Sequence, residues 1–181
     1  MKKILPVIVA ILLCGTAFAG ETGIEVRGLY FSPSEQAFKD IYGGGVSFGL
    51  DLSFNLWNAV DIWIGGSYFT KTGELSFTKE DTTIRIIPLG LGVRYRFIKD
   101  GTVSPYAGLG VNYFLFTEEN IIGKVEKGAV GPVVRVGVLL NVAKGFFFDL
   151  MVEYSYCRIN PADFRINIGG ISAGIGAGID F

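Results

Sequence analysis

The sequence INIGGISAGIGAGIDF, residues 166–181, alternates between apolar and small or polar residues with a period of two. In an extended chain this period places the apolar residues on one face and the glycines, Ser172 and Asp180 on the other. The apolar face consists of Ile171, Ala173, Ile175, Ala177, Ile179 and Phe181. An apolar edge strand of this length would promote aggregation in water, whereas a closed sheet in a bilayer would place that face in lipid. The segment therefore predicts the closing strand of a transmembrane β-barrel.

The composition supports a membrane wall made of strands. The 181 residues carry a net charge of −1 and include 26 Gly, 15 Phe and 8 Tyr, but no His. An excess of glycine and aromatic residues with few charges is typical of a β-rich membrane protein, and the length suits one domain. Without His, the chain cannot use the catalytic His of outer-membrane barrel hydrolases and acyltransferases, and we find no local Ser/Lys or paired-carboxylate motif. We therefore expect no enzyme, no cofactor and no metal site.

The first residues resemble a secretory signal peptide. Lys2 and Lys3 precede the apolar run 4–13, which is too short to span a bilayer as a helix. Small residues at Ala17 and Ala19 predict cleavage between Ala19 and Gly20, so that residues 1–19 are removed and residues 20–181 form the barrel. Cys14 leaves open a lipoprotein alternative, although Leu13 is bulky for such processing.

The alternating pattern recurs along the rest of the chain. The expected strands are 24–31, 41–54, 60–69, 82–97, 103–116, 128–141, 146–157 and 166–181. The longer loops between them are 32–40, 70–81, 117–127 and 158–165. An even number of strands of about ten residues or more predicts an all-β, eight-stranded, closed up-and-down antiparallel barrel, with short periplasmic turns and longer external loops.

Nine charged residues of these strands fall in the phase that points inward. They are Arg27, Arg94, Arg96, Arg135, Asp51, Asp61, Asp149, Glu153 and Asp180. A charge facing lipid at mid-bilayer costs about 2–4 kcal/mol, and a one-residue slip would turn every charge outward, so this phase sets the register. The alternative is a soluble sandwich with the two faces reversed.

We expect the inward charges to form a network, because the interior of an eight-stranded barrel is just wide enough to be filled by side chains. The predicted network contains Arg27, Arg94, Arg96, Arg135, Asp149 and Glu153. Arg135 and Glu153 lie on neighbouring strands and should pair, because either charge buried alone would be costly. The alternative is an ion pathway lined by Arg27, Arg135 and Glu153.

Two residues depart from a regular wall. Pro88 lies inside an expected strand and removes a ladder hydrogen bond, so we expect a bulge or a local break there. Trp63 points inward by strict alternation, and is therefore either lumenal near the periplasmic mouth or displaced by a bulge.

The stretches IPLGLGVRY (87–95) and PYAGLGVNY (105–113) resemble the small outer-membrane β-barrel family, which includes OmpA membrane domains, OmpX and opacity-type surface proteins. The resemblance covers the chain from Gly20 and implies location in the outer membrane of a Gram-negative-type bacterium. Phe181 resembles the terminal residue that the outer-membrane assembly machinery reads, which implies that machinery as a partner.

We expect a structural or surface-interaction role, with a narrow porin-like channel or a carrier for a small apolar ligand as the alternative. The expected partners are outer-membrane lipid, lipopolysaccharide and a host or envelope surface ligand contacted by loops 71–81 and 117–127. No basic or aromatic series indicates nucleic acid, and we expect a monomer.

Overall fold

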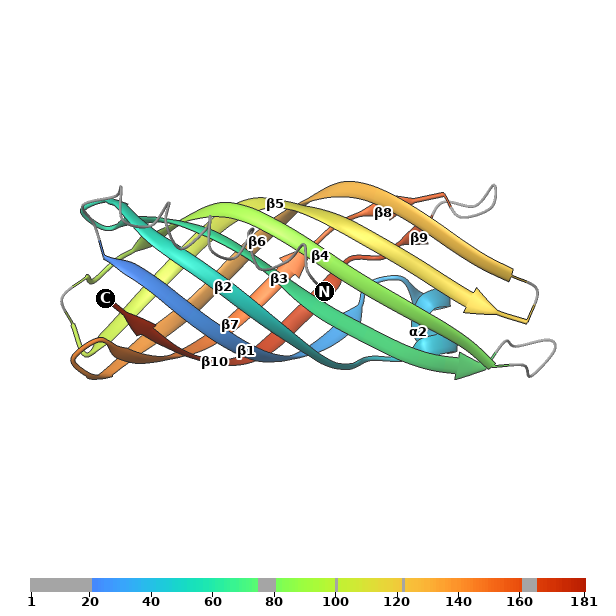
Figure 1. Cartoon of the computed structure of the whole chain (residues 1–181), viewed down its shortest axis with the longest axis horizontal. Coiled ribbons are helices and arrows are strands. Elements are labelled where there is room, and N and C mark those ends of the chain that lie inside the picture. Colours follow the sequence, from blue (N-terminus) through green and yellow to red (C-terminus); the bar gives the residue numbers. More distant parts are fainter. Residues whose placement is uncertain (1–20, 75–80, 100, 122, 161–165) are drawn as a thin grey trace, which may run out of the picture.

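A computed structural model describes residues 21–74, 81–99, 101–121, 123–160 and 166–181. Over these residues, eight antiparallel strands close into a barrel in the order β1-β10-β7-β6-β5-β4-β3-β2, with a two-stranded β8–β9 hairpin at one end (Figure 1). The barrel strands are β1 (Thr22–Pro33), β2 (Gly45–Trp57), β3 (Val60–Glu74), β4 (Asp81–Arg96), β5 (Val103–Asn120), β6 (Gly123–Ala143), β7 (Phe146–Ser155) and β10 (Gly170–Asp180). The predicted fold class is confirmed.

The closing strand pairs with the first strand, as predicted. Val26 lies opposite Ala177 in the β1–β10 register, and the backbone N–H of Thr22 donates to the carbonyl of Phe181 at 3.0 Å. The predicted phase also holds: Val26 is 58% exposed, whereas its neighbours Glu25 and Arg27 are buried. Every other inward charge named above except Glu153 and Asp180 is also buried, and these two are half-buried. Apolar residues therefore cover the lipid face and the charges line the lumen.

The barrel has two unlike ends. The β2–β3, β4–β5 and β6–β7 turns are short and lie at the end that holds Phe181, whereas α2, the β8–β9 hairpin and the tips of the long strands lie at the other (Figure 1). Outer-membrane barrels have short periplasmic turns and longer external connections, so the end with α2 is extracellular. Among the described residues, no helix has the length and apolar character needed to cross a bilayer.

The predicted loop 32–40 is wrong. β1 continues to Pro33, and the short helix α2 (Gln36–Tyr42) follows, so β2 begins at Gly45 and not at residue 41. Phe38 and Tyr42 stand four residues apart on one face of α2, with ring centroids 5.0 Å apart, and both are buried. Burial of this face in the barrel mouth stabilises a helix that would be too short to form alone.

The predicted loop 117–127 is also wrong, because β5 and β6 continue as one hairpin and pair as far as Asn120 opposite Gly123. A membrane strand needs about 9–11 residues, so strands of 18 and 21 residues extend well beyond the bilayer. β3 likewise runs to Glu74 and β4 begins at Asp81. The closing strand is shorter than predicted, because residues 166–167 form β9 (Ile166–Asn167), which pairs with β8 (Arg158–Ile159).

Pro88 interrupts the wall on one side only. The β3–β4 pairing passes from Gly66–Leu89 to Phe69–Ile86 without a change of register, so the two intervening pairs are missing, whereas Pro88 remains opposite Phe114 in β5. The expected local break is present without a bulge. The register shifts lie at Asn55/Trp57 and Asn141/Ala143, next to periplasmic turns. The predicted signal peptide and its cleavage site at Ala19 and Gly20 lie outside the described residues.

Candidate functional site

The lumen is the candidate site, and its periplasmic end is organised by Asp61 of β3. One carboxylate oxygen of Asp61 accepts a hydrogen bond from Nε of Arg94, its cross-strand neighbour, at 2.9 Å. The other oxygen accepts from Nη2 of Arg96 at 2.9 Å and from the side-chain amide of Asn55 at 2.9 Å. Asp61 and the two arginines are buried, so two cations share one carboxylate at this end.

Arg135 of β6 is the centre of a second layer, deeper in the barrel. Its Nη1 donates to Asp51 at 2.5 Å, and its Nε and Nη2 donate to Glu153 at 3.1 and 2.9 Å. Arg27 approaches the same two carboxylates, with Nη2 2.8 Å from Asp51 and Nη1 3.6 Å from Glu153. Two guanidinium groups and two carboxylates thus form a closed, charge-balanced ring across the lumen.

Aromatic side chains fill the space between the two layers. The guanidinium carbon of Arg135 lies 4.1 Å from the ring centroid of Trp63, which is only 2% exposed. The Tyr106 hydroxyl donates to Asp149 at 2.7 Å, and the guanidinium carbon of Arg94 lies 5.4 Å from the Tyr106 ring. Trp63 is therefore lumenal, as one of its two predicted positions required, and it packs under the central arginine.

Glycines in the wall make room for these rings. A Cβ atom added at Gly90 would lie 2.8 Å from Trp63, and one added at Gly92 would lie 2.6 Å from it. A Cβ added at Gly137 would lie 2.6 Å from the hydroxyl of Tyr106. Glycine at these three inward positions thus leaves space for the Trp63 and Tyr106 rings.

Glu25 and Asp149 are lumenal carboxyl groups that have no ion pair among the described residues. Glu25 and Asp149 each have one carboxyl oxygen that is buried and lacks a hydrogen-bond partner there. Asp149 is held by Tyr106 and not by an arginine. The predicted network is therefore divided: Arg27, Arg135 and Glu153 meet in one layer, Arg94 and Arg96 belong to another, and Asp149 lies apart from direct ion pairs.

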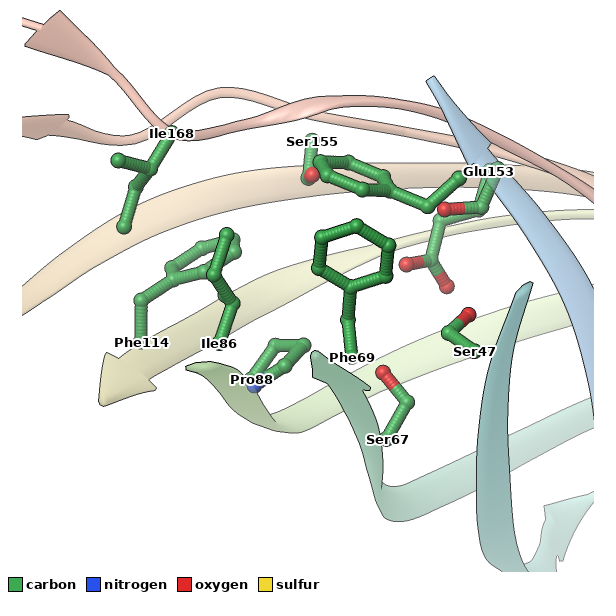
Figure 2. A pocket seen from close by; sticks show the side chains of 11 residues that line it. Ser47, Ser67, Phe69, Ile86, Pro88, Phe114, Glu153, Ser155 and Ile168 are labelled. Carbon is green, nitrogen blue, oxygen red and sulfur yellow. The ribbon is translucent and has the colours of Figure 1, made fainter. Parts of the chain in front are cut away.

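A belt of serines separates the charged layers from the extracellular half of the lumen. Ser47, Ser67, Ser155 and Ser172 line a small cavity with Glu153 (Figure 2). Apolar side chains close its other side, and Figure 2 shows Ile86, Phe114 and Ile168 there. The cavity has a volume of about 20 Å³, measured as the space open to the centre of a water molecule. This volume holds one or two water molecules.

Above the belt, an apolar plug fills the mouth. It consists of Phe31, Phe38, Tyr42, Phe69, Ile84, Ile86, Phe114, Phe116, Cys157, Ile159 and Ile168. α2 belongs to this plug, because Tyr42 hydrogen-bonds Glu118 at 2.7 Å and Thr82 at 3.1 Å. Burial raises the pKa of Tyr42, so its hydroxyl remains a donor and fastens the helix to β4 and β5.

Sequence reasoning found the Arg135–Glu153 pair but omitted other parts of the site. It placed Asp51 inward but did not name it as the second partner of Arg135. It also overlooked the plug. Alternation shows which residues face inward, but it does not show that apolar inward residues from several strands lie at the same height in the barrel. The spacing of Phe38, Ile41 and Tyr42 was the available signal for α2.

Several solved protein structures have the same fold. The chain aligns with Neisserial surface protein A with a TM-score of 0.71 and 15% identity, covering 90% of this chain and 99% of that one. It aligns with OprG from Pseudomonas aeruginosa with a TM-score of 0.73 and 17% identity, covering 91% and 97%. It aligns with Ail, the attachment invasion locus protein of Yersinia pestis, with a TM-score of 0.58 and 18% identity, covering 90% and 99%. No curated protein sequence shows significant similarity.

Residues 5–181 match the family model described as the outer membrane protein beta-barrel domain. The match spans nearly the whole chain and agrees with the closed barrel, its apolar outer face and its charged lumen. The chain therefore belongs to the outer membrane protein beta-barrel family, and its barrel lies in the outer membrane of a Gram-negative-type bacterium.

Proposed function

We propose that this protein is a structural and surface-contact component of the outer membrane whose lumen is sealed, and that it is not an enzyme. The main support is that two barriers, a charged ring and an apolar plug, block the lumen at different heights. The ring of Arg27, Asp51, Arg135 and Glu153 crosses it at one height, and the apolar plug with α2 fills it above. An ion would have to displace both to pass.

The extracellular strands supply the contact surface. β3, β4, β5 and β6 pair with one another beyond the level at which β7 ends, so a twisted sheet stands outside the membrane (Figure 1). The outward face of this sheet lies beyond the bilayer and carries exposed Arg85, Glu119, Lys124 and Glu126. A rigid sheet presents such groups at fixed spacing, which favours a partner or envelope contact over a passive loop.

Planar-bilayer recording on the purified, refolded protein tests the sealed lumen. We expect no steady single-channel currents under conditions in which a general porin conducts. A matched variant without the plug contacts of α2, Phe38→Ala with Tyr42→Ala, should still lack steady currents because the charged ring remains. Steady unitary currents from the unaltered protein would contradict the proposal.

A second candidate is carriage of a small apolar molecule through the wall, favoured by the missing β3–β4 pairs beside Pro88. Pro88 also lines the serine-belt cavity. However, the space in that cavity suits one or two waters and not an organic ligand. Uptake of a fluorescent apolar probe into liposomes separates the two functions: sealed barrels should give the rate of protein-free liposomes, whereas a carrier should accelerate uptake and lose that effect in Pro88→Ala.

A further inference from the structure

The barrel wall splits between β6 and β7 just above the membrane. Pairing of these strands ends at Val133 opposite Ser155, and the N–H of Tyr156 then donates to the carbonyl of Pro132 at 3.1 Å. Pro132 has no N–H to continue the ladder. Beyond it, β6 continues toward Gly123 along β5, whereas the chain after Tyr156 leaves the barrel ladder, forms β8 and pairs with β9. In the part of the chain that the structure describes, no β ladder joins these two branches beyond Pro132.

A cleft of about 470 Å³ lies between the two branches. Lys127, Gly128 and Ala129 of β6 line one side, and Arg158, Ile159 and Asn160 line the other. Because the carbonyl of Pro132 points toward the β7 side, the alternation of a strand points the N–H of Gly128 toward the cleft as well. The polar side chains that line the cleft are the ammonium of Lys127, the guanidinium of Arg158 and the amide of Asn160.

The charges of this cleft are not compensated. Among the described residues, neither Lys127 nor Arg158 has a carboxylate within ion-pair distance, whereas nearby Lys124 pairs with Glu126. Arg158 is fixed instead over the Tyr156 ring, with its guanidinium carbon 5.2 Å from the centroid. Of the residues that the structure describes, two cations and no acid line this concave site, which is the electrostatic pattern of an anion site.

The level of the cleft identifies the kind of anion. Exposed tyrosines form the extracellular aromatic girdle at Tyr30, Tyr68, Tyr113 and Tyr154, which are 58, 43, 47 and 46% exposed. Such rings lie at the level of lipid headgroups. The hydroxyl of Tyr113 lies against Gly128, because a Cβ atom there would collide with it. The cleft therefore begins where the girdle ends, which is where the phosphates of outer-leaflet lipids lie.

We infer that this cleft binds the phosphate of a phosphorylated glycolipid in the outer leaflet, the headgroup chemistry of lipopolysaccharide. Lys127 and Arg158 bind the phosphate from the two sides of the cleft, while the Asn160 amide and the N–H of Gly128 donate neutral hydrogen bonds to it. This inference rests on the proposed surface-contact function and names a partner for it. The lipid anchors the split edge of the wall to the membrane surface.

Binding of bisphosphorylated lipid A to the refolded barrel in detergent micelles tests this inference. The test variant is Lys127→Gln with Arg158→Gln, and the control is Lys39→Gln with Lys71→Gln, which removes the same charge from exposed extracellular positions outside the cleft. Each cation near a charged lipid surface contributes enough that losing two should weaken binding about 30-fold. The control should bind like the unaltered protein, and dephosphorylated lipid A should bind all three proteins as weakly as the test variant binds lipid A.

Equal binding of lipid A by the test and control variants would overturn the inference, and so would equal binding of the two lipids. If inorganic phosphate displaced lipid A at equal concentration, the cleft would be a free-anion site and the lipid assignment would be wrong. Tryptophan fluorescence and the heat-dependent gel mobility of folded barrels verify that the variants fold. Conductance of the same samples tests the sealed lumen separately, since currents with intact lipid binding would contradict only that function.

Discussion

Arg135 stacks on Trp63 inside the barrel, with the guanidinium carbon 4.1 Å from the ring centroid. This pair joins β6 to β3 across the lumen and combines a charged group with the largest fully buried side chain. A cation over an indole face is favourable and gains strength where water is excluded. The pair therefore couples the charged ring to the aromatic packing below it, and both can be tested by substitution.

Replacing Arg135 with Met should destabilise the barrel by about 3–5 kcal/mol, because buried Asp51 and half-buried Glu153 would lose their central cation and keep only Arg27 as a partner. Urea unfolding of the protein in lipid vesicles measures this loss. Adding Asp51→Asn and Glu153→Gln to the same variant should recover most of the stability. If the single substitution cost as little as Val136→Leu on the lipid face, the ring would not contribute to stability.

The two tryptophans of the chain should report opposite environments. Trp57 is 78% exposed in the periplasmic girdle, whereas Trp63 is 2% exposed. In vesicles with brominated lipid, Trp63→Phe, which leaves Trp57, should show strong quenching, and Trp57→Phe should show little. The reverse result would mean that β3 is shifted by one residue and that Asp61 faces lipid.

Leu150→Arg should cost about 2–4 kcal/mol, because Leu150 faces lipid midway between the aromatic girdles. Leu56→Arg, next to the periplasmic turn, should cost only about 0–1 kcal/mol, since an interfacial charge stays hydrated. Unfolding in vesicles compares the two variants. Equal costs would contradict the assignment of the bilayer boundaries.

Gly90→Ala should destabilise the barrel by about 1–3 kcal/mol, because the added Cβ would lie 2.8 Å from Trp63. Trp63→Leu in the same chain should remove part of that penalty by opening the space. A double-mutant cycle measures the coupling. Purely additive effects would show that the wall and the ring do not compete for this space.

Cys157 should resist alkylation in the folded protein at neutral pH. It follows the end of β7 beyond the girdle, is 1% exposed, and burial raises the pKa of its thiol to about 11. The reactive thiolate is therefore scarce at pH 7 and should increase as the pH rises toward 11. Maleimide labelling of a Cys14→Ser chain, with and without denaturant, measures this difference. Rapid labelling of the folded form at pH 7 would contradict the burial.

The wall was predictable because each lipid-facing position must be apolar, which makes the period of two visible in β2, β4 and β10. The same requirement gave the inward phase of Arg27, Arg135 and Glu153. Beyond the girdle this requirement ends, since both faces meet water. The sequence 117–127 therefore reads as a loop, although residues 117–120 and 123–127 continue the ladder. The interior cluster of Phe31, Phe69 and Phe114 depends on the relative register of strands that are distant in sequence, and the order of residues alone does not give this register.

The bond between Asp51 and Arg135 constrains how the barrel can be assembled. β2 and β6 are diametrically opposite, with β1, β10 and β7 between them on one side and β3, β4 and β5 on the other. These two side chains cannot meet in a growing, open sheet, unlike Asp61–Arg94 and Arg135–Glu153, which join neighbouring strands. Closure of the seam between β1 and β10 therefore brings the Asp51–Arg135 ion pair together and adds its stabilisation only at the last step of assembly.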